Sequence, residues 1–319
     1  MERVFGLKRI ARHPRAVATL GVFDGVHRGH QAVLAETVAW ARRINGTAVA
    51  ITFDRHPDTV VRATPPATIT SLEHRLLLIE KLAVDVVVVL HFDESLRGME
   101  PEDFAREVFV ERLGAAGVVL GFSSRFGKGA RGNSALLAKV GKRCGFEVRA
   151  TEPCLVAGLV VSSTLIRSLI TRGELTQASE LLGRPVSILG TVMHGDKRGK
   201  ALGFPTANLN LHHEVTPPAG VYISRVLFDG RALWGLVNIG YRPTFLGQGE
   251  PPKKTIEVYI DEYDAGEGLY ARAIEAQIVR FLRSERRFES AEALTLQMEK
   301  DRRMLRTFKT SWDQRQLTP

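Results

Sequence analysis

The chain has 319 residues, of which 44% are hydrophobic and 25% are charged, and its formal net charge is +9. This composition is ordinary for a soluble globular protein, and the length exceeds what one compact core usually holds, so we expect two domains. The positive charge indicates either an Arg-rich solvated surface or a partner that carries phosphate. Because the charge is not gathered into one tail, the pattern argues against a nucleic-acid partner.

The cysteines and the most apolar segment bear on location. Cys144 and Cys154 have no CxxC or other metal-ligand spacing, which predicts a reducing compartment and core positions. The basic first 23 residues contain no uninterrupted apolar stretch, so no signal peptide is predicted. The run "LAVDVVVVLHF" is shorter than the roughly 20 residues that span a bilayer. We therefore expect a cytoplasmic protein with no membrane partner.

Between residue 16 and about residue 182, short β-branched runs alternate with stretches of helical periodicity. The predicted strands are 16–23, 46–53, 84–90, 116–122 and 146–151, and the predicted helices are 30–44, 72–81, 101–113 and 133–144. Continuous apolar strands that alternate with helices predict a parallel sheet covered on both faces. Ligands of such sheets bind beyond the carboxyl ends of the strands, and the first run leaves its strand at that edge.

The second half has a different pattern. Strand-like runs separated by Gly and Pro occur at 187–193, 220–228, 231–240, 254–260 and 271–282, and a helix is predicted only over 290–308. This is typical of an antiparallel barrel or sandwich with a terminal helix. We place the boundary near 183–185, which gives domains 1–183 and 184–319.

The stretch "TLGVFDGVHRGHQAVL", residues 19–34, joins the first strand to the first helix. Gly21 and Gly25 permit a tight turn and the close approach of a ligand to the backbone. His27 and His30 are three residues apart at the start of a helix and therefore share a face. Because the N-terminus of a helix attracts anions, two imidazoles at this position could bind phosphate oxygens.

Two other interpretations of these histidines stay open. They could be capping or surface side chains of an ordinary strand–turn–helix corner. They could also bind zinc, which needs a third and a fourth ligand. Asp24 and His56 are candidates by residue type, but their spacing does not support them, so we favour phosphate binding.

The stretch "VSSTLIRSLI", residues 161–170, supplies hydroxyl groups before a helical run. Ser162, Ser163 and Thr164 provide an N-cap, and Arg167 follows one turn inside the helix, where its guanidinium can meet a phosphate. By itself this pattern indicates only a well-capped helix. Together with a phosphate site at residues 19–34, it predicts a second contact to a polyphosphate.

In the second half, the stretch "GTVMHGDKRGKALGFPTANLNL" carries the strongest signals. Gly195 and Gly199 bracket a basic loop that contains Lys197, but the glycine spacing and the following alanine do not fit a P-loop. It is either a basic surface turn or a loop that covers nucleotide phosphates. In an extended segment Thr206 and Asn208 project to one side, where their oxygens could hold Mg²⁺ or satisfy backbone groups in a turn.

The run "KTIEVYI", residues 254–260, predicts a strand with Ile256, Val258 and Ile260 on one face and Glu257 and Tyr259 on the other. A glutamate that points into a barrel is either ion-paired or poised as a general base. From the strand alone, a salt-bridged or solvated Glu257 is favoured.

Both halves resemble one known family. "GVFDGVHRGH" resembles the GxFDGxHxGH signature of the HxGH nucleotidyltransferases, and "SSTLIR" resembles their SSTxIR partner. "HGDKRGKALGFPTANL", "GVYI", "VNIGYRPTF", "IEVYI" and "FLRSERRF" are similar to the riboflavin kinase module. From about residue 16 to about residue 306, the chain therefore resembles the bacterial bifunctional riboflavin kinase/FAD synthetases.

The resemblance implies a Rossmann-like α/β nucleotidyltransferase domain followed by an antiparallel β-barrel kinase domain with a C-terminal helix. It implies that the chain phosphorylates riboflavin to FMN and adenylylates FMN to FAD with release of pyrophosphate. The implied substrates are riboflavin, FMN and ATP, and Mg²⁺ accompanies ATP. No permanently bound redox cofactor is required.

The resemblance also implies roles for individual residues. The implied catalytic residues are Glu257, as the base for the ribityl hydroxyl, and His27, His30 and Arg167 on the ATP phosphates. The implied ATP contacts are Gly21, Phe23, Asp24, Gly25, Ser163, Thr164, Gly195, Lys197 and Gly199. Thr206 and Asn208 are the implied ligands of magnesium and phosphate.

The chain departs from the family pattern in its first half. "GFSSRFG" has Ser123 and Ser124 where the family commonly has Asp or Asn and an aromatic residue, and "RHP" replaces Pro-His-Pro. Since a serine hydroxyl cannot carry a carboxylate's charge, an alternative is a riboflavin kinase with weak or lost adenylyltransferase activity. A flavin- or nucleic-acid-binding regulator is a further alternative, which the aromatic content of 7% does not favour.

Overall fold

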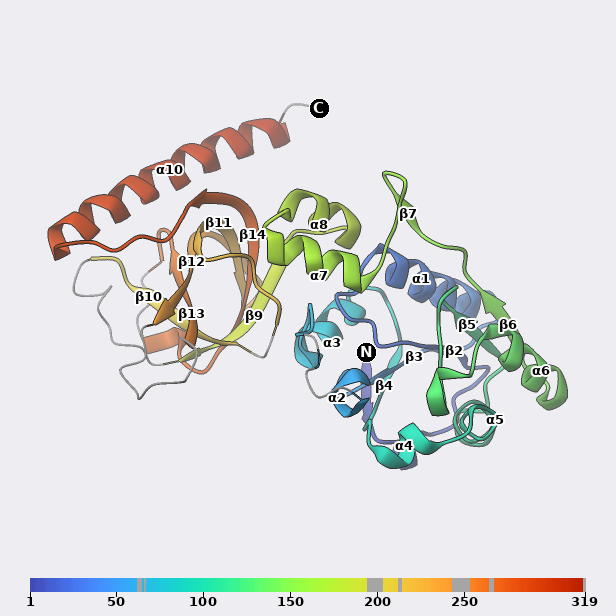
Figure 1. Ribbon diagram of the computed structural model, residues 1–319. Coiled ribbons are helices and arrows are strands. Elements are labelled where there is room, and N and C mark those ends of the chain that lie inside the picture. The colour runs from blue at the N-terminus through green and yellow to red at the C-terminus, as the bar shows by residue number, and fades with distance from the viewer. Residues whose placement is uncertain are drawn as a thin grey trace. The chain divides into compact units, whose positions relative to one another are not determined.

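The computed structural model describes residues 1–61, 65, 67–193, 203–211, 214–242, 253–263 and 267–317. The chain forms two compact units, each with its own hydrophobic core (Figure 1). The first, the α/β unit, contains Met1–Ile166 and Leu181–Gly183, and the second, the barrel unit, contains Arg167–Glu180 and Arg184–Pro319. The division of function at residue 183 stays a prediction.

Six parallel strands form the sheet of the α/β unit, in the order β1-β4-β3-β2-β5-β6. Their bounds are β1 (Glu2–Phe5), β2 (Val17–Leu20), β3 (Ala48–Phe53), β4 (Val86–Leu90), β5 (Gly117–Leu120) and β6 (Glu147–Ala150). Every residue of β2, β3, β4 and β5 is buried, as expected for central strands with both faces covered.

Helices cover both faces of this sheet (Figure 1). On one face lie α1 (Arg28–Arg43) and α3 (Leu72–Glu80). On the other lie α5 (Pro101–Ala105), its π-helical continuation η2 (Arg106–Arg112), and α6 (Ser134–Cys144). The shorter elements of the unit are η1 (Leu7–Arg9), α2 (Asp58–Val61), α4 (Glu94–Gly98), η3 (Lys128–Ala130), and the hairpin of β7 (Leu155–Val156) and β8 (Leu159–Val160).

Two helices follow the hairpin, α7 (Ser163–Arg172) and α8 (Leu175–Leu182). The barrel strands are β9 (Val186–Met193), β10 (Thr206–Leu211), β11 (Gly220–Phe228), β12 (Arg231–Arg242), β13 (Lys253–Ile260) and β14 (Ala273–Arg283), with η4 (Glu267–Leu269) between the last two. These six strands pair antiparallel in the order β10-β13-β12-β11-β14-β9 and close into a barrel. Apolar residues such as Ile256 and Val258 fill its interior.

The C-terminal helix α10 (Ala291–Leu317) packs on the outside of the barrel, where Leu305 and Phe308 meet Tyr259. Two charged pairs fix it: Arg306 to the buried Asp261 at 3.1 Å, and Arg283 to the buried Asp301 at 2.7 Å. Because a buried carboxylate without a partner is costly, these pairs hold the helix in one position. Within the described ranges, no helix combines the length and the apolar character that a membrane crossing requires.

The predicted fold class is confirmed, with a parallel α/β sheet followed by an antiparallel barrel and a terminal helix. The five predicted strands of the first half correspond to β2–β6. The pattern does not predict β1, whose four residues are mostly exposed and pair only with β4. The helix predicted over 101–113 widens into the π-helix η2, for which the structure offers no physical reason.

Close packing between α1 and β5 gives a test of this fold. A Cβ atom on Gly117 would lie 2.2 Å from the ring of the buried Trp40. We expect Gly117→Ala to destabilise the α/β unit by about 1–3 kcal/mol through overpacking. Amide hydrogen exchange in β2 and β5 should then be at least roughly tenfold faster. Gly98→Ala, where a Cβ would meet nothing within 4 Å, is the control, and equal exchange in both variants would contradict this packing.

Candidate functional site

The loop of residues 21–27 joins β2 to α1 at the carboxyl edge of the sheet. Its backbone takes positive φ angles at Phe23 (51°), Gly25 (81°) and Val26 (40°). Such a conformation is strained for a β-branched residue and persists only where the surroundings hold it. Gly21 is required here because a Cβ at that position would lie 2.9 Å from the buried Phe23 ring.

Buried hydrogen bonds hold this loop in its strained form. Asp24 is 1% exposed, and its Oδ1 accepts from the backbone N–H of Ile69 at 2.8 Å and of Thr70 at 3.1 Å. The Gly25 N–H donates to Thr70 Oγ1 at 2.9 Å. One carboxylate oxygen of Asp24 therefore shapes the loop, and its contact with ATP stays a prediction.

The two histidines lie together at the start of α1. His27 Nδ1 accepts from the backbone N–H of His30 at 3.2 Å, and the two rings stack with centroids 3.6 Å apart. Gly29 leaves room for this stack, because a Cβ there would lie 3.2 Å from the His27 ring. Since Nδ1 of His27 is an acceptor, its ring proton is on Nε2. The expectation that the pair shares one face of the helix start is confirmed.

The zinc interpretation gains no support. His56 Nδ1 accepts from the N–H of Asp58 at 3.1 Å, in the loop that precedes α2. Asp24 uses Oδ1 for the backbone. Among the residues that the structure describes, no three His, Cys, Asp or Glu side chains are grouped to bind a metal ion.

His30 is the side chain most changed by this environment. Phe23 packs against it edge-on, with ring centroids 5.4 Å apart, and its buried Nδ1 has no hydrogen-bond partner within the described chain. Burial, the neighbouring His27 and the positive charge of Arg75 lower the pKa of His30 well below its usual value. His30 is therefore a neutral imidazole at neutral pH.

The segment "SSTLIR" meets this loop in space. Ser162 caps α7 by accepting from the Leu165 N–H at 3.3 Å, and Ser163 Oγ donates to the Asp24 carbonyl at 2.9 Å. Thr164 is exposed in the first turn of α7, and Arg167 is half-buried one turn later. The N-termini of α1 and α7 therefore share one loop, which brings two anion-attracting helix ends together.

The departure from the family pattern lies at the same edge of the sheet. Ser123 and Ser124 follow β5, which pairs with β2 directly beside the loop of residues 21–27. The Ser124 N–H donates to the Gly121 carbonyl at 3.0 Å in a tight turn, and Ser123 is exposed.

The barrel unit places its candidate residues in one row. Thr206 and Asn208 alternate along β10, while Asn208 is directly opposite Glu257 of β13. Because Ile256 and Val258 fill the barrel interior, half-buried Glu257 lies on the outer face. An inward orientation of this glutamate is thus corrected. Gly195, Lys197 and Gly199 lie outside the described residues.

Sequence reasoning overlooked two residues of these sites. Asn238 of β12 is directly opposite Glu257, so the glutamate is flanked by an asparagine on each side. Strand alternation could have placed Asn238 on this face, but strand pairing is needed to set it beside Glu257. The second is Arg75, which lies in α3 without any distinguishing sequence pattern and whose charge reaches His30.

The lowered pKa of His30 predicts a pH-dependent stability. As pH falls below about 6.5, the unfolded chain binds a proton that folded His30 does not, so the free energy of unfolding decreases. The contribution of His30 to the free energy of unfolding is fully present above that pH. It is lost progressively as the pH falls toward the lowered pKa of folded His30. We expect His30→Gln to reduce the difference between the free energies of unfolding at about pH 7.5 and about pH 5.5. Urea unfolding followed by Trp40 fluorescence measures these free energies, in chains whose Trp234 and Trp312 are replaced by Phe. An equal loss of stability between the two pH values in the chains with and without His30→Gln would contradict the lowered pKa of His30.

Comparison with known proteins identifies the family. The FAD synthetase family model matches residues 9–165, and the riboflavin kinase model matches residues 182–309. The bifunctional riboflavin kinase/FMN adenylyltransferase of Escherichia coli K12 is 34% identical, with 97% of this chain and 98% of that protein covered. The protein of the same description from Listeria monocytogenes is 37% identical, with 92% of each chain covered. A crystal structure described as a macrolide-efflux protein from Streptococcus pneumoniae superposes with a TM-score of 0.82 at 26% identity, covering 96% of this chain and 99% of that one. The chain therefore belongs to the bifunctional riboflavin kinase/FMN adenylyltransferase family.

Proposed function

We propose that this chain phosphorylates riboflavin to FMN in residues 184–319 and adenylylates FMN to FAD in residues 1–183. The descriptions of its full-length relatives support both activities. The observation that carries the adenylyl transfer is the hydrogen bond from Ser163 to the Asp24 carbonyl, which joins the two phosphate-binding segments.

In the proposed adenylyl transfer, an oxygen of the FMN phosphate attacks the α-phosphorus of ATP. A new P–O bond forms, the bond to the bridging oxygen breaks, and pyrophosphate leaves with the bonding electrons. No protein nucleophile or proton acceptor is needed, so catalysis depends on positioning and on stabilisation of charge. His27, His30, Thr164 and Arg167 supply donors for this purpose at the N-termini of α1 and α7.

In the proposed kinase reaction, Glu257 accepts the proton of the ribityl hydroxyl as that oxygen attacks the γ-phosphorus of ATP. ADP leaves with the electrons of the broken P–O bond. Thr206 and Asn208 present hard oxygen atoms on the same outer face as Glu257, which fits the ligand preference of Mg²⁺. Magnesium bound with ATP would reduce the negative charge of the phosphates.

The chemistry also bears on cofactors and location. Both reactions move phosphoryl or adenylyl groups without electron transfer, so neither needs a resident redox cofactor. Cys144 and Cys154 are free thiols in the structure, but Cys144 is exposed and Cys154 half-buried, so the predicted core positions are wrong. The free thiols support a reducing compartment, and we propose the cytoplasm.

Purified protein with riboflavin, ATP and Mg²⁺ tests the proposed function. We expect chromatography to resolve both FMN and FAD, with FMN appearing first. FMN without FAD would instead support a riboflavin kinase that has lost adenylyl transfer, which is the alternative raised by Ser123. Formation of neither flavin would contradict both enzymatic assignments and leave a binding protein.

Two substitutions test the assignment of one reaction to each domain. Glu257→Gln should lower FMN formation by about 10²–10⁴-fold and spare adenylylation of supplied FMN. His30→Ala should lower FAD formation by about 10²-fold and spare the kinase. Glu174→Gln removes only an exposed ion pair to Arg172 and is the control for the first variant. Loss of both activities in either folded variant would show that the reactions are not divided in this way.

A further inference from the structure

Arg75 is a buried cation whose hydrogen-bonding capacity is incompletely used. The residue is 1% exposed, and its Nη1 donates to Thr52 Oγ1 at 3.1 Å and to the Phe53 carbonyl at 3.0 Å. Its Nε is buried and has no hydrogen-bond partner in the part of the chain that the structure describes. A guanidinium has five N–H donors in a fixed plane, so the Nε–H of Arg75 is a donor that a further acceptor could satisfy.

Both hydrogen bonds of Arg75 go to neutral acceptors, Thr52 and the Phe53 carbonyl, and two carboxylates act on it through their charge. The charges of Asp24 and Asp54 oppose the effect of burial, which lowers the pKa of Arg75. However, Asp24 Oδ1 is occupied by backbone N–H groups, and Asp54 accepts from His91 at 2.5 Å and from the Phe92 N–H at 3.1 Å. A buried charge is normally paired, because its transfer out of water is otherwise very costly. Within the described residues, the two carboxylates oppose the cost of burying Arg75 only through their charge, and an anionic ligand would supply a hydrogen-bonded partner.

The position of Arg75 identifies where this anion binds. Thr52 Oγ1, which accepts from Arg75, donates at 3.1 Å to the carbonyl of Val22 in the loop of residues 21–27. Phe53 ends β3, directly beside β2 at the carboxyl edge of the sheet. The charge of Arg75 also reaches His30, whose buried Nδ1 has no partner either. Two incompletely satisfied side chains thus border the same phosphate site.

We propose that Arg75 is a further catalytic residue of adenylyl transfer and binds the phosphate group that lies against His30. This inference rests on the proposed function of the α/β unit. Arg75 forms no covalent bond and transfers no proton during the reaction. It stays protonated and offsets negative charge as the P–O bond to FMN forms and the bond to pyrophosphate breaks.

A different explanation makes Arg75 only a clamp that fixes the end of β3 through its two Nη1 bonds. Two variants separate these roles. Arg75→Met keeps an apolar stem and removes the charge, whereas Arg75→Lys keeps the charge and loses the planar fork. A clamp predicts equal impairment in both variants, and phosphate binding predicts partial recovery in the lysine variant.

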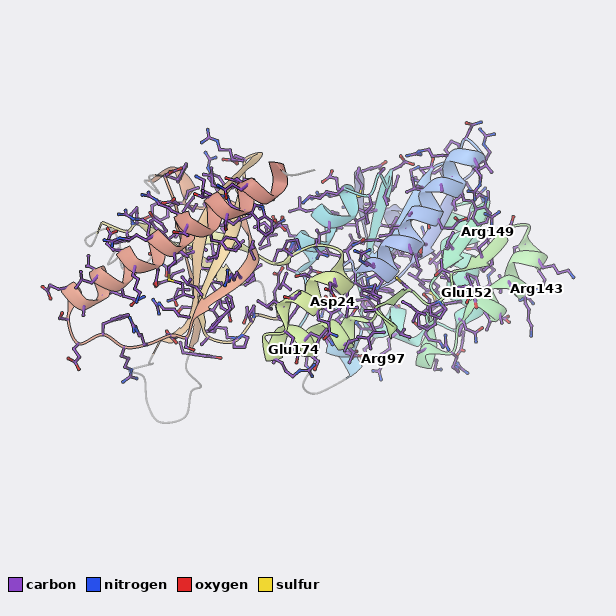
Figure 2. The ribbon with its side chains drawn as sticks, turned by 90° about the horizontal axis from the view of Figure 1, so that it is seen from above. Asp24, Arg97, Arg143, Arg149, Glu152 and Glu174 are labelled. Atoms are coloured by element: carbon purple, nitrogen blue, oxygen red, sulfur yellow. The ribbon has the colours of Figure 1, made fainter. Side chains whose placement is uncertain are left out.

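The decisive measurement is FAD formation by the full chain from supplied FMN and ATP. For Arg75→Met we expect kcat to fall by about 100-fold, with a smaller change in KM for ATP, and for Arg75→Lys an intermediate kcat. Kinase activity in the same sample should stay unchanged. Arg143→Met is the matched control, because Arg143 is exposed on α6 and lies far from Asp24 (Figure 2). Undiminished FAD formation by Arg75→Met, or equal loss in both variants, would overturn the proposal.

A measurement on the wild-type chain covers the case in which Arg75→Met does not fold. The Arg75 Nε–H resonance, assigned by its absence from the spectrum of Arg75→Lys, should shift when inorganic pyrophosphate is added. No shift at saturating pyrophosphate would overturn the proposed contact. Wild-type protein that makes no FAD would instead contradict the proposed function itself, so the two failures are distinguishable.

Discussion

The α/β site depends on the buried carboxylate of Asp24. A carboxylate is tolerated in an interior only when its oxygens accept hydrogen bonds, and Asp24 Oδ1 accepts two from the backbone near Thr70. The carbonyl of the same residue accepts from Ser163. One position in a short loop thus holds segments that lie 45 and 139 residues away in the sequence. With these anchors in place, the positive φ angles of Phe23 and Val26 persist despite their strain.

Parallel topology explains why so many site residues come from separate segments. The carboxyl ends of β2, β3 and β5 meet at one edge, so the loop of residues 21–27, Thr52 and Ser123 become neighbours in the sheet order although they are far apart in sequence. In the barrel, antiparallel pairing also brings residues of separate segments together, because it places Asn208 and Asn238 on either side of Glu257. In each unit, strand pairing brings the candidate residues together.

The sequence predicts features that depend on local interactions, and it does not predict those that depend on contacts between distant segments. His27, His30 and the cap at Ser162 are local patterns, and periodicity alone places them at helix N-termini. The row of Thr206, Asn208 and Glu257 also follows from alternation within single strands. Arg75 could not be found in this way, because its importance comes from contacts with Thr52 and Phe53, more than 20 residues away. The outer orientation of Glu257 likewise depends on which face of the closed barrel is filled, which is a property of all six strands.

The two candidate sites differ in charge, as expected if their proposed reactions differ in the need to move a proton. Attack by a phosphate oxygen that is already anionic requires no base. The candidate α/β site accordingly presents a neutral imidazole, a buried guanidinium and helix N-termini, while Asp24 Oδ1 accepts from backbone donors. Attack by a ribityl hydroxyl requires loss of its proton, and the barrel unit presents a half-buried carboxylate between two amides. On this reasoning, Ser123, where the family commonly has Asp or Asn, replaces a group that the proposed adenylyl transfer would not need as a base. In the proposed reaction, the departure at Ser123 therefore bears on nucleotide binding and not on proton transfer.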